Sequence, residues 1–119
     1  MFTYRIHSGV LTSSRLGAIG MGYSGHGPGK NNPDMQAEHD VGPIPVGRYT
    51  IGPPEDGHGG FALRLTHDPG NEMFGRDGFL IHGDSVSEPG TASLGCIILP
   101  RMIRWAIWGS GDRDLEVVR

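Results

Sequence analysis

The sequence has one cysteine, little surplus charge and no long apolar run, and each shortage excludes a class of protein. A single cysteine, Cys96, can form neither an intrachain disulfide framework nor a cysteine-based zinc site. Ten basic and 13 acidic residues give a net charge of −3, so nothing attracts the chain to nucleic acid or anionic membranes. No apolar segment approaches the roughly 20 residues that span a bilayer, and residues 1–15 lack the pattern of a signal peptide.

Glycine and proline are abundant, with 21 and 9 of the 119 residues. This composition borders on that of disordered chains, but disorder combines few apolar residues with high net charge, and here 36% of residues are hydrophobic. The glycines follow no fixed period, which excludes a collagen-like structure. We therefore expect residues 1–119 to form one compact, turn-rich domain, and we favour a monomer.

Hydrophobic patterning predicts a mainly β fold of roughly seven short strands. Residues 2–7 and 61–67 alternate between apolar and polar side chains, which is the period of a half-buried strand. Further strands are expected in short apolar segments, at 17–23, 48–51, 79–82, 96–99 and 115–118, and residues 10–12 could pair with the first strand as a hairpin.

One short helix is expected at about 100–108, with Pro100 at its first position and Gly109 just past its end. Residues 24–47, in contrast, are rich in loop formers throughout. A structureless segment of this length inside a compact domain is usually functional.

Cys96 is the first candidate for chemistry. A free cysteine before three apolar residues is as often a core residue as a nucleophile. Cys96, however, follows a polar loop and Gly95, and the amides of Leu94, Gly95 and Cys96 could converge on a developing oxyanion. A thiol needs a base, because its free pKa of about 8.5 leaves little thiolate at neutral pH. The position therefore favours a nucleophile with a partner.

His82 is the best placed of the six histidines to be that partner. It ends an apolar segment, and if 79–82 and 96–99 are neighbouring strands, its imidazole can meet the thiol. Asp84, Ser85 or a nearby backbone carbonyl could orient the ring through its second nitrogen. The alternative is a histidine that is merely hydrogen-bonded at a strand end.

The other motifs in the sequence give little evidence of a function. The remaining histidines show no metal-ligand spacing, so no metal and no other cofactor is expected. A dinucleotide-type GxGxxG at 20–25 and a near match to a serine-hydrolase elbow at 22–26 both lack the helix that must follow, because Pro28 lies between two glycines.

The stretch IHGDSVSEPGTASLGCIIL, residues 81–99, resembles the active-site signature of L,D-transpeptidases of the YkuD type. With GYSGHGPGKNNPD at 22–34, GPIPVGRYTIG at 42–52 and LEVV at 115–118, the chain is similar over nearly its whole length to the DUF2778 family, which includes the Tlde1-type effectors of bacterial type VI secretion. The resemblance implies a YkuD-like β-sandwich or barrel-like catalytic domain.

The resemblance also assigns roles to individual residues. Cys96 matches the nucleophile and His82 the general base. The YkuD group usually has a second histidine where this chain has Leu94 and an arginine where it has Ile98, but the effector-type relatives lack that histidine too. The oxyanion and supporting candidates are Gly83, Asp84, Ser93, Leu94 and Gly95, and the candidate substrate contacts are Tyr49, Arg76 and Asp77.

The reaction implied is acyl transfer on peptidoglycan tetrapeptide stems, as an L,D-carboxypeptidase, an L,D-transpeptidase or a D-amino-acid exchange enzyme. Two alternatives stay open: a cysteine amidase or endopeptidase of the cell wall, and a non-catalytic wall-binding module with a buried Cys96. Thiol reactivity distinguishes the wall-binding module from the enzymes, because a cysteine paired with histidine should alkylate readily below pH 7.

The expected place of action is the periplasm or wall of a target bacterium. The chain would be made in the cytoplasm and delivered by secretion machinery, or encoded by a phage. The resemblance further implies an immunity protein that blocks the active site in the producing cell.

Overall fold

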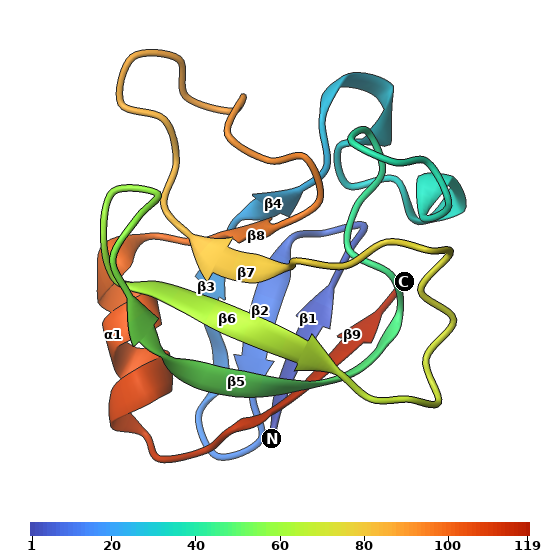
Figure 1. The fold of residues 1–119 in the computed structure, drawn as a ribbon. Coiled ribbons are helices and arrows are strands. Elements are labelled where there is room, and N and C mark those ends of the chain that lie inside the picture. The colour runs from blue at the N-terminus through green and yellow to red at the C-terminus, as the bar shows by residue number, and fades with distance from the viewer.

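The computed structural model describes residues 1–119 as nine β-strands, one α-helix and two 3-10 helices (Figure 1). In chain order these are β1 (Phe2–Arg5), β2 (Val10–Ser13), β3 (Gly17–Met21), β4 (Tyr23–Ser24), η1 (Gly27–Gly29), η2 (Pro33–Met35), β5 (Gly47–Glu55), β6 (Ala62–His67), β7 (Leu80–His82), β8 (Ile97–Ile98), α1 (Arg101–Gly109) and β9 (Asp114–Val118). The predicted mainly β class with one short helix is confirmed. At nine residues, α1 is too short to cross a bilayer, and the fold has no other α-helix.

All nine strands belong to one sheet, in the order β3-β2-β1-β9-β5-β6-β7-β8-β4. The two edge strands, β3 and β4, follow one another in the chain and are separated by Gly22 alone. A sheet whose edges are joined by one residue has to curl until those edges approach each other. The result is a nearly closed, barrel-like sheet (Figure 1).

Gly22 permits this closure because its position has no room for a side chain. A Cβ there would lie 1.6 Å from the carbonyl oxygen of Ile98 and 3.1 Å from the Leu99 side chain. The Gly22 amide donates to the carbonyl of Gly9, between β1 and β2, at 2.8 Å. In this part of the glycine-rich segment 20–29, glycine therefore allows close backbone packing.

The interior of the barrel is filled by every second side chain of its strands. Seventeen buried residues form one hydrophobic cluster, which includes the fully buried Tyr4, Ile81 and Ile97. Since Ile81 and Ile97 point into this core, the residues beside them on β7 and β8 point to the outer face. That alternation decides where the candidate site can lie.

Most expected strands differ from the structure by one or two residues at an end, and two of them differ by more. The segment 17–23, predicted as one strand, is divided between β3 and β4 at opposite edges of the sheet. The strand expected at 48–51 continues through Pro53 and Pro54 to Glu55 in β5, whose register against β6 shifts between Ile51 and Pro54. Such an irregularity accommodates prolines, which cannot donate to the ladder.

The helix is displaced by one residue from the expected 100–108. Pro100 is the N-cap, with ψ of 153°, rather than the first helical residue. Gly109 is the last helical residue, and the glycine with a positive φ after the helix is Gly111, at 79°. A glycine does occupy the C′ position after the helix, as predicted, but it is Gly111 and not Gly109.

The segment expected to be a long loop, 24–47, is ordered by short turns and side-chain hydrogen bonds. The Asn32 side chain caps η2 by accepting from the amide of Asp34 at 3.0 Å. The buried hydroxyl of Ser24 accepts from the amide of Ile44 at 2.9 Å, which fastens the two ends of the segment together. This segment forms one wall of the candidate site.

Replacing Gly22 with alanine is expected to lower the free energy of unfolding by about 3 kcal/mol, because β4 and β8 would have to separate. Urea denaturation followed by circular dichroism measures the change. Gly109→Ala is the control, since nothing lies near its Cβ position and alanine favours a helix by up to about 1 kcal/mol. Equal stability of the two variants would contradict the closure at Gly22.

Candidate functional site

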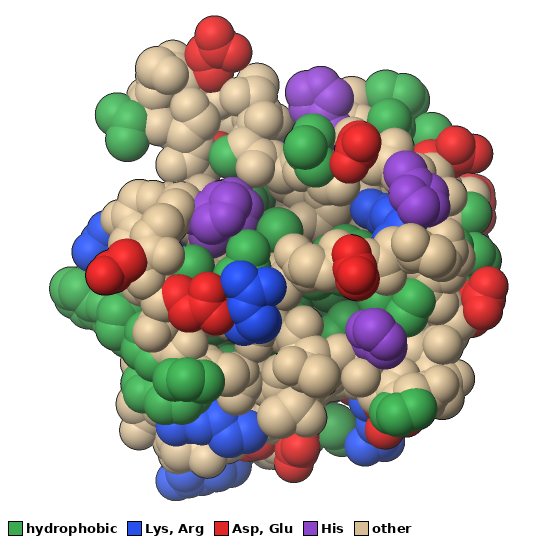
Figure 2. Space-filling view, in the orientation of Figure 1, with side chains coloured by type: hydrophobic (Ala, Val, Ile, Leu, Met, Phe, Trp, Pro, Cys, Tyr) green, Lys and Arg blue, Asp and Glu red, His purple; other side chains and the backbone are tan.

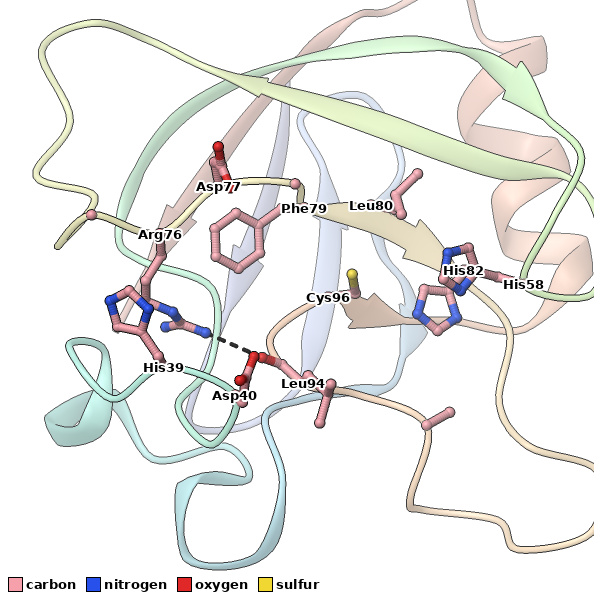
Figure 3. Close-up of a pocket in the computed structure, with 13 residues that line it drawn as sticks. His39, Asp40, His58, Arg76, Asp77, Phe79, Leu80, His82, Leu94 and Cys96 are labelled. Atoms are coloured by element: carbon pink, nitrogen blue, oxygen red, sulfur yellow. Dashed lines mark hydrogen bonds between the residues drawn. The ribbon is translucent and has the colours of Figure 1, made fainter.

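Cys96 and His82 line one pocket of about 390 Å³ (Figure 3). Figure 3 places Cys96 between two ends of this pocket: His58 and His82 lie at one, and Arg76 with His39 at the other. Figure 2 shows histidine and carboxylate side chains spread over much of the face in view. The pocket thus combines a thiol, imidazoles and polar side chains at its rim.

The thiol and the imidazole reach the same pocket because β7 and β8 are parallel neighbours. Ile81 pairs with Ile97, and His82 with Ile98. Cys96, one residue before β8, therefore lies beside Leu80, whose backbone forms a hydrogen bond with the thiol. The neighbouring strands expected from the sequence are present, and they place Cys96 and His82 on the outer face of the sheet.

A backbone carbonyl orients His82. Its Nδ1 lies 2.8 Å from the carbonyl oxygen of Gly83. Since a carbonyl can only accept, Nδ1 carries the proton and Nε2 of the neutral ring is left as the basic atom. Only 4% of His82 is exposed, and this burial lowers the pKa of the imidazole.

Asp84, a candidate for orienting that ring, has other partners. Its carboxylate accepts from the hydroxyl of Tyr23 at 2.6 Å and from the amides of Ser85 and Gly90 at 2.8 and 3.0 Å. The Tyr23 hydroxyl accepts in turn from the amide of Ala92 at 2.9 Å. Asp84 therefore organises the loop between His82 and Cys96 instead of contacting the histidine ring.

Ser93 shapes the turn that presents Cys96. Its buried hydroxyl donates to the carbonyl of Cys96 at 2.6 Å and accepts from the amides of Gly95 and Gly25 at 3.0 and 2.9 Å. Ser24 donates to the carbonyl of Gly95 at 2.8 Å from the opposite side. Two buried hydroxyls thus fix the backbone immediately before the thiol.

These bonds narrow the set of oxyanion donors. Of the three amides expected to converge on an oxyanion, that of Gly95 is already bound to Ser93. The amides of Leu94 and Cys96 make no hydrogen bond in the structure. They are the two backbone donors near the thiol that remain available.

Arg76 supports the turn before Cys96 by hydrogen bonds to backbone carbonyls. Its guanidinium is buried and uses four of its five N–H donors on backbone carbonyls, those of Gln36, Gly42, Pro43 and Leu94. A Cβ on Gly95 would lie 2.5 Å from this guanidinium, so the glycine makes room for the arginine. With its donors engaged, Arg76 holds the loop 24–47 against the Cys96 turn and is a weaker candidate for a substrate contact.

A second buried arginine supports the His82 side. Arg104, on α1, lies 2.7 Å from the position a Cβ would take on Gly83. It donates to the carbonyl of Leu99, which follows β8, at 3.0 Å. Both glycines beside the candidate residues therefore accommodate the protein's own arginines.

Of the other two predicted substrate contacts, the structure brings only one to the pocket. Tyr49 is buried in the hydrophobic core, where its hydroxyl donates to the carbonyl of Pro45 at 2.7 Å, and it does not line the pocket. Asp77 is exposed and lines the pocket. His39 and His58, which the sequence did not single out, line it as well, because the β5–β6 connection and the loop 24–47 fold over the outer face.

Burial raises the pKa of the Cys96 thiol, although the Leu80 amide and the charges of Arg64 and Arg76 oppose this effect. No hydrogen bond joins the thiol to His82, whose own pKa is lowered by burial. The free protein therefore favours a neutral thiol beside a neutral imidazole, rather than a thiolate and imidazolium pair.

Comparison with known proteins gives one match: the sequence model of the Tlde1 domain matches residues 19–117. No curated protein and no solved structure matches the chain. The likeness to YkuD-type enzymes therefore rests on the sequence motif, and it stays a prediction.

Alkylation of Cys96 by iodoacetamide should be slow at pH 7 and should rise with a midpoint above that of a free cysteine peptide, because the thiol pKa is raised. Stopped samples analysed by mass spectrometry give the rate at each pH. His82→Ala should leave the midpoint nearly unchanged. A wild-type midpoint below pH 7 that rises in His82→Ala would instead reveal a preformed ion pair.

Arg76→Met is expected to lower the free energy of unfolding by at least about 3 kcal/mol, because buried carbonyls lose a charged donor. Thermal and urea unfolding both measure it. Arg15→Met is the matched control and should change stability by less than about 0.5 kcal/mol, since Arg15 is exposed. Similar effects of the two changes would exclude the supporting role of Arg76.

Proposed function

The chain belongs to the Tlde1 domain family, and from that premise we propose that it is a type VI secretion effector that performs cysteine-dependent acyl transfer on peptidoglycan. Membership of the family suggests the effector class. The observation that supports the enzymatic part is that Cys96 and His82 line one pocket, where β7 ends in His82 and its parallel partner β8 begins directly after Cys96. We treat residues 1–119 as one catalytic domain that acts as a monomer.

The substrate proposed is the tetrapeptide stem of peptidoglycan, attacked at the carbonyl that precedes the terminal D-alanine. The Sγ of Cys96 forms a bond to this carbon while the thiol proton passes to Nε2 of His82. The amides of Leu94 and Cys96 donate to the oxyanion. The C–N bond then breaks, and D-alanine leaves with the proton from His82.

The thioester that remains can be resolved by two kinds of acceptor. Water gives an L,D-carboxypeptidase reaction, and an amine gives transpeptidation or D-amino-acid exchange. In both cases His82 takes a proton from the acceptor, and the thiol of Cys96 is restored. The lowered pKa of His82 keeps the neutral base available into mildly acidic solution, below the pH at which an ordinary histidine becomes protonated.

Two alternatives remain to be tested against this proposal. A cysteine amidase or endopeptidase would use the same pair on another bond of the stem. A non-catalytic wall-binding module is favoured by one observation, the raised pKa of the Cys96 thiol. The partners proposed are the secretion machinery and an immunity protein, with action in the periplasm or wall of a target bacterium.

Purified tetrapeptide muropeptides, incubated with the protein with and without a D-amino acid, test the proposal by mass spectrometry. Loss of D-alanine alone, or its exchange, is expected in wild type. Cys96→Ala and His82→Ala should lower the rate by about a thousandfold or more, because nucleophile and base act as a unit. His26→Ala is the control, since His26 is exposed and outside the pocket.

Loss of a larger fragment would replace the proposal with the amidase or endopeptidase. Binding of muropeptides without any change in mass would replace it with the wall-binding module. Equal turnover in wild type and Cys96→Ala would show that the thiol is not the nucleophile.

A further inference from the structure

The imidazole of His82 is covered by a second imidazole. The rings of His58 and His82 stack with centroids 4.5 Å apart and an interplanar angle of 26°. Figure 3 shows the two rings side by side at one end of the pocket, which both residues line. His82 is buried while His58 is exposed, so His58 lies between the His82 ring and solvent.

The backbone that carries His58 is unusual. His58 has a φ of 48°, a left-handed conformation that non-glycine residues adopt at a cost of about 1 kcal/mol or more. Gly57, Gly59 and Gly60 around it have φ of 107°, 86° and 90°. With Phe61, whose φ is 50°, five consecutive residues have positive φ, and this backbone places the imidazole where an ordinary β5–β6 connection would not.

Helix α1 holds this connection in place. Arg101 donates to the carbonyl of Gly59 at 2.8 Å. Arg104 donates to the carbonyls of Gly60 and Phe61, both at 2.9 Å. Two arginines of the first turns of α1 thus bind three consecutive carbonyls directly after His58, and one of them, Arg104, is buried.

We propose that His58 is a positioning residue for His82: its ring covers the imidazole and holds it where Nδ1 meets the Gly83 carbonyl and Nε2 serves the Cys96 thiol. This inference rests on the proposed function. It extends that function by a third side chain, supplied by the β5–β6 connection, that need not touch the substrate.

Removing the His58 ring should change the pKa of His82 in a defined direction. Burial and the neighbouring charge of His58 both lower the pKa of His82, so His58→Ala should raise that pKa toward its ordinary value. His58→Phe keeps a ring over the imidazole and removes only the charge, so its effect should be smaller. The other titratable or charged groups around the pair are Glu55, Arg64, Asp84, Cys96, Arg101 and Arg104.

The test follows the His82 ring by NMR titration and muropeptide turnover in wild type, His58→Ala, His58→Phe and the control His67→Ala, an exposed histidine outside the pocket. In His58→Ala we expect kcat to fall by about tenfold or more with KM changed by less than about threefold. The acid limb of the pH profile should move to higher pH together with the His82 titration. His58→Phe should restore most of kcat.

Three results would overturn the inference: an unchanged His82 titration in His58→Ala, a change in KM alone, or no rescue by His58→Phe in a folded variant. The NMR arm needs no substrate, so it separates this inference from the proposed function. If wild type converts no muropeptide but His58→Ala still raises the pKa of His82, the proposed function fails while the cover over His82 stands. If wild type is active and the titration is unchanged, only the inference fails.

Discussion

The parallel pairing of β7 with β8 is the constraint on which the site depends. The register of this pair sets Ile81 opposite Ile97 in the core, so that His82 and Cys96, one residue to either side, lie on the other face and line one pocket. Parallel strands also cannot be joined by a tight turn, because the chain has to return to the starting end of the sheet. The long segment between histidine and cysteine is thus a topological requirement, and the Tyr23–Asp84 hydrogen bond organises it.

Two buried arginines give the pocket a rigid frame. Arg76 donates hydrogen bonds to backbone carbonyls of the loop 24–47 and of the turn before Cys96. Arg104 donates to carbonyls of the β5–β6 connection and of the chain after β8. A guanidinium satisfies several carbonyls in a fixed planar arrangement. The loop 24–47 and the β5–β6 connection are thereby hydrogen-bonded to buried side chains, which is the support that the proposed reaction needs to orient its groups.

Local pattern was enough to predict most of the strands, because alternation and short apolar runs are local signals. The proximity of His82 to Cys96 was predicted only on the condition that their strands are neighbours, which the structure shows. It failed where distant segments decide the outcome. Tyr49, given as a candidate substrate contact, lies on the same face of β5 as Ile51, and this face points into the core. The glycines around His58 indicate a turn and not a site, and only the fold of the β5–β6 connection brings His58 to the pocket. The closure at Gly22 likewise depends on Ile98, far along the chain.

The group that orients His82 is a backbone carbonyl, and it cannot gain or lose a proton as the pH changes. A carboxylate in that place would take up a proton in acid and release the ring, whereas the Gly83 carbonyl has nothing to titrate. Because Gly83 is the next residue in the chain, the base and its acceptor also move together when the loop moves. The tautomer of His82 is therefore independent of pH wherever the ring is neutral, and in the proposed reaction Nε2 is the ring atom that takes up and releases the proton.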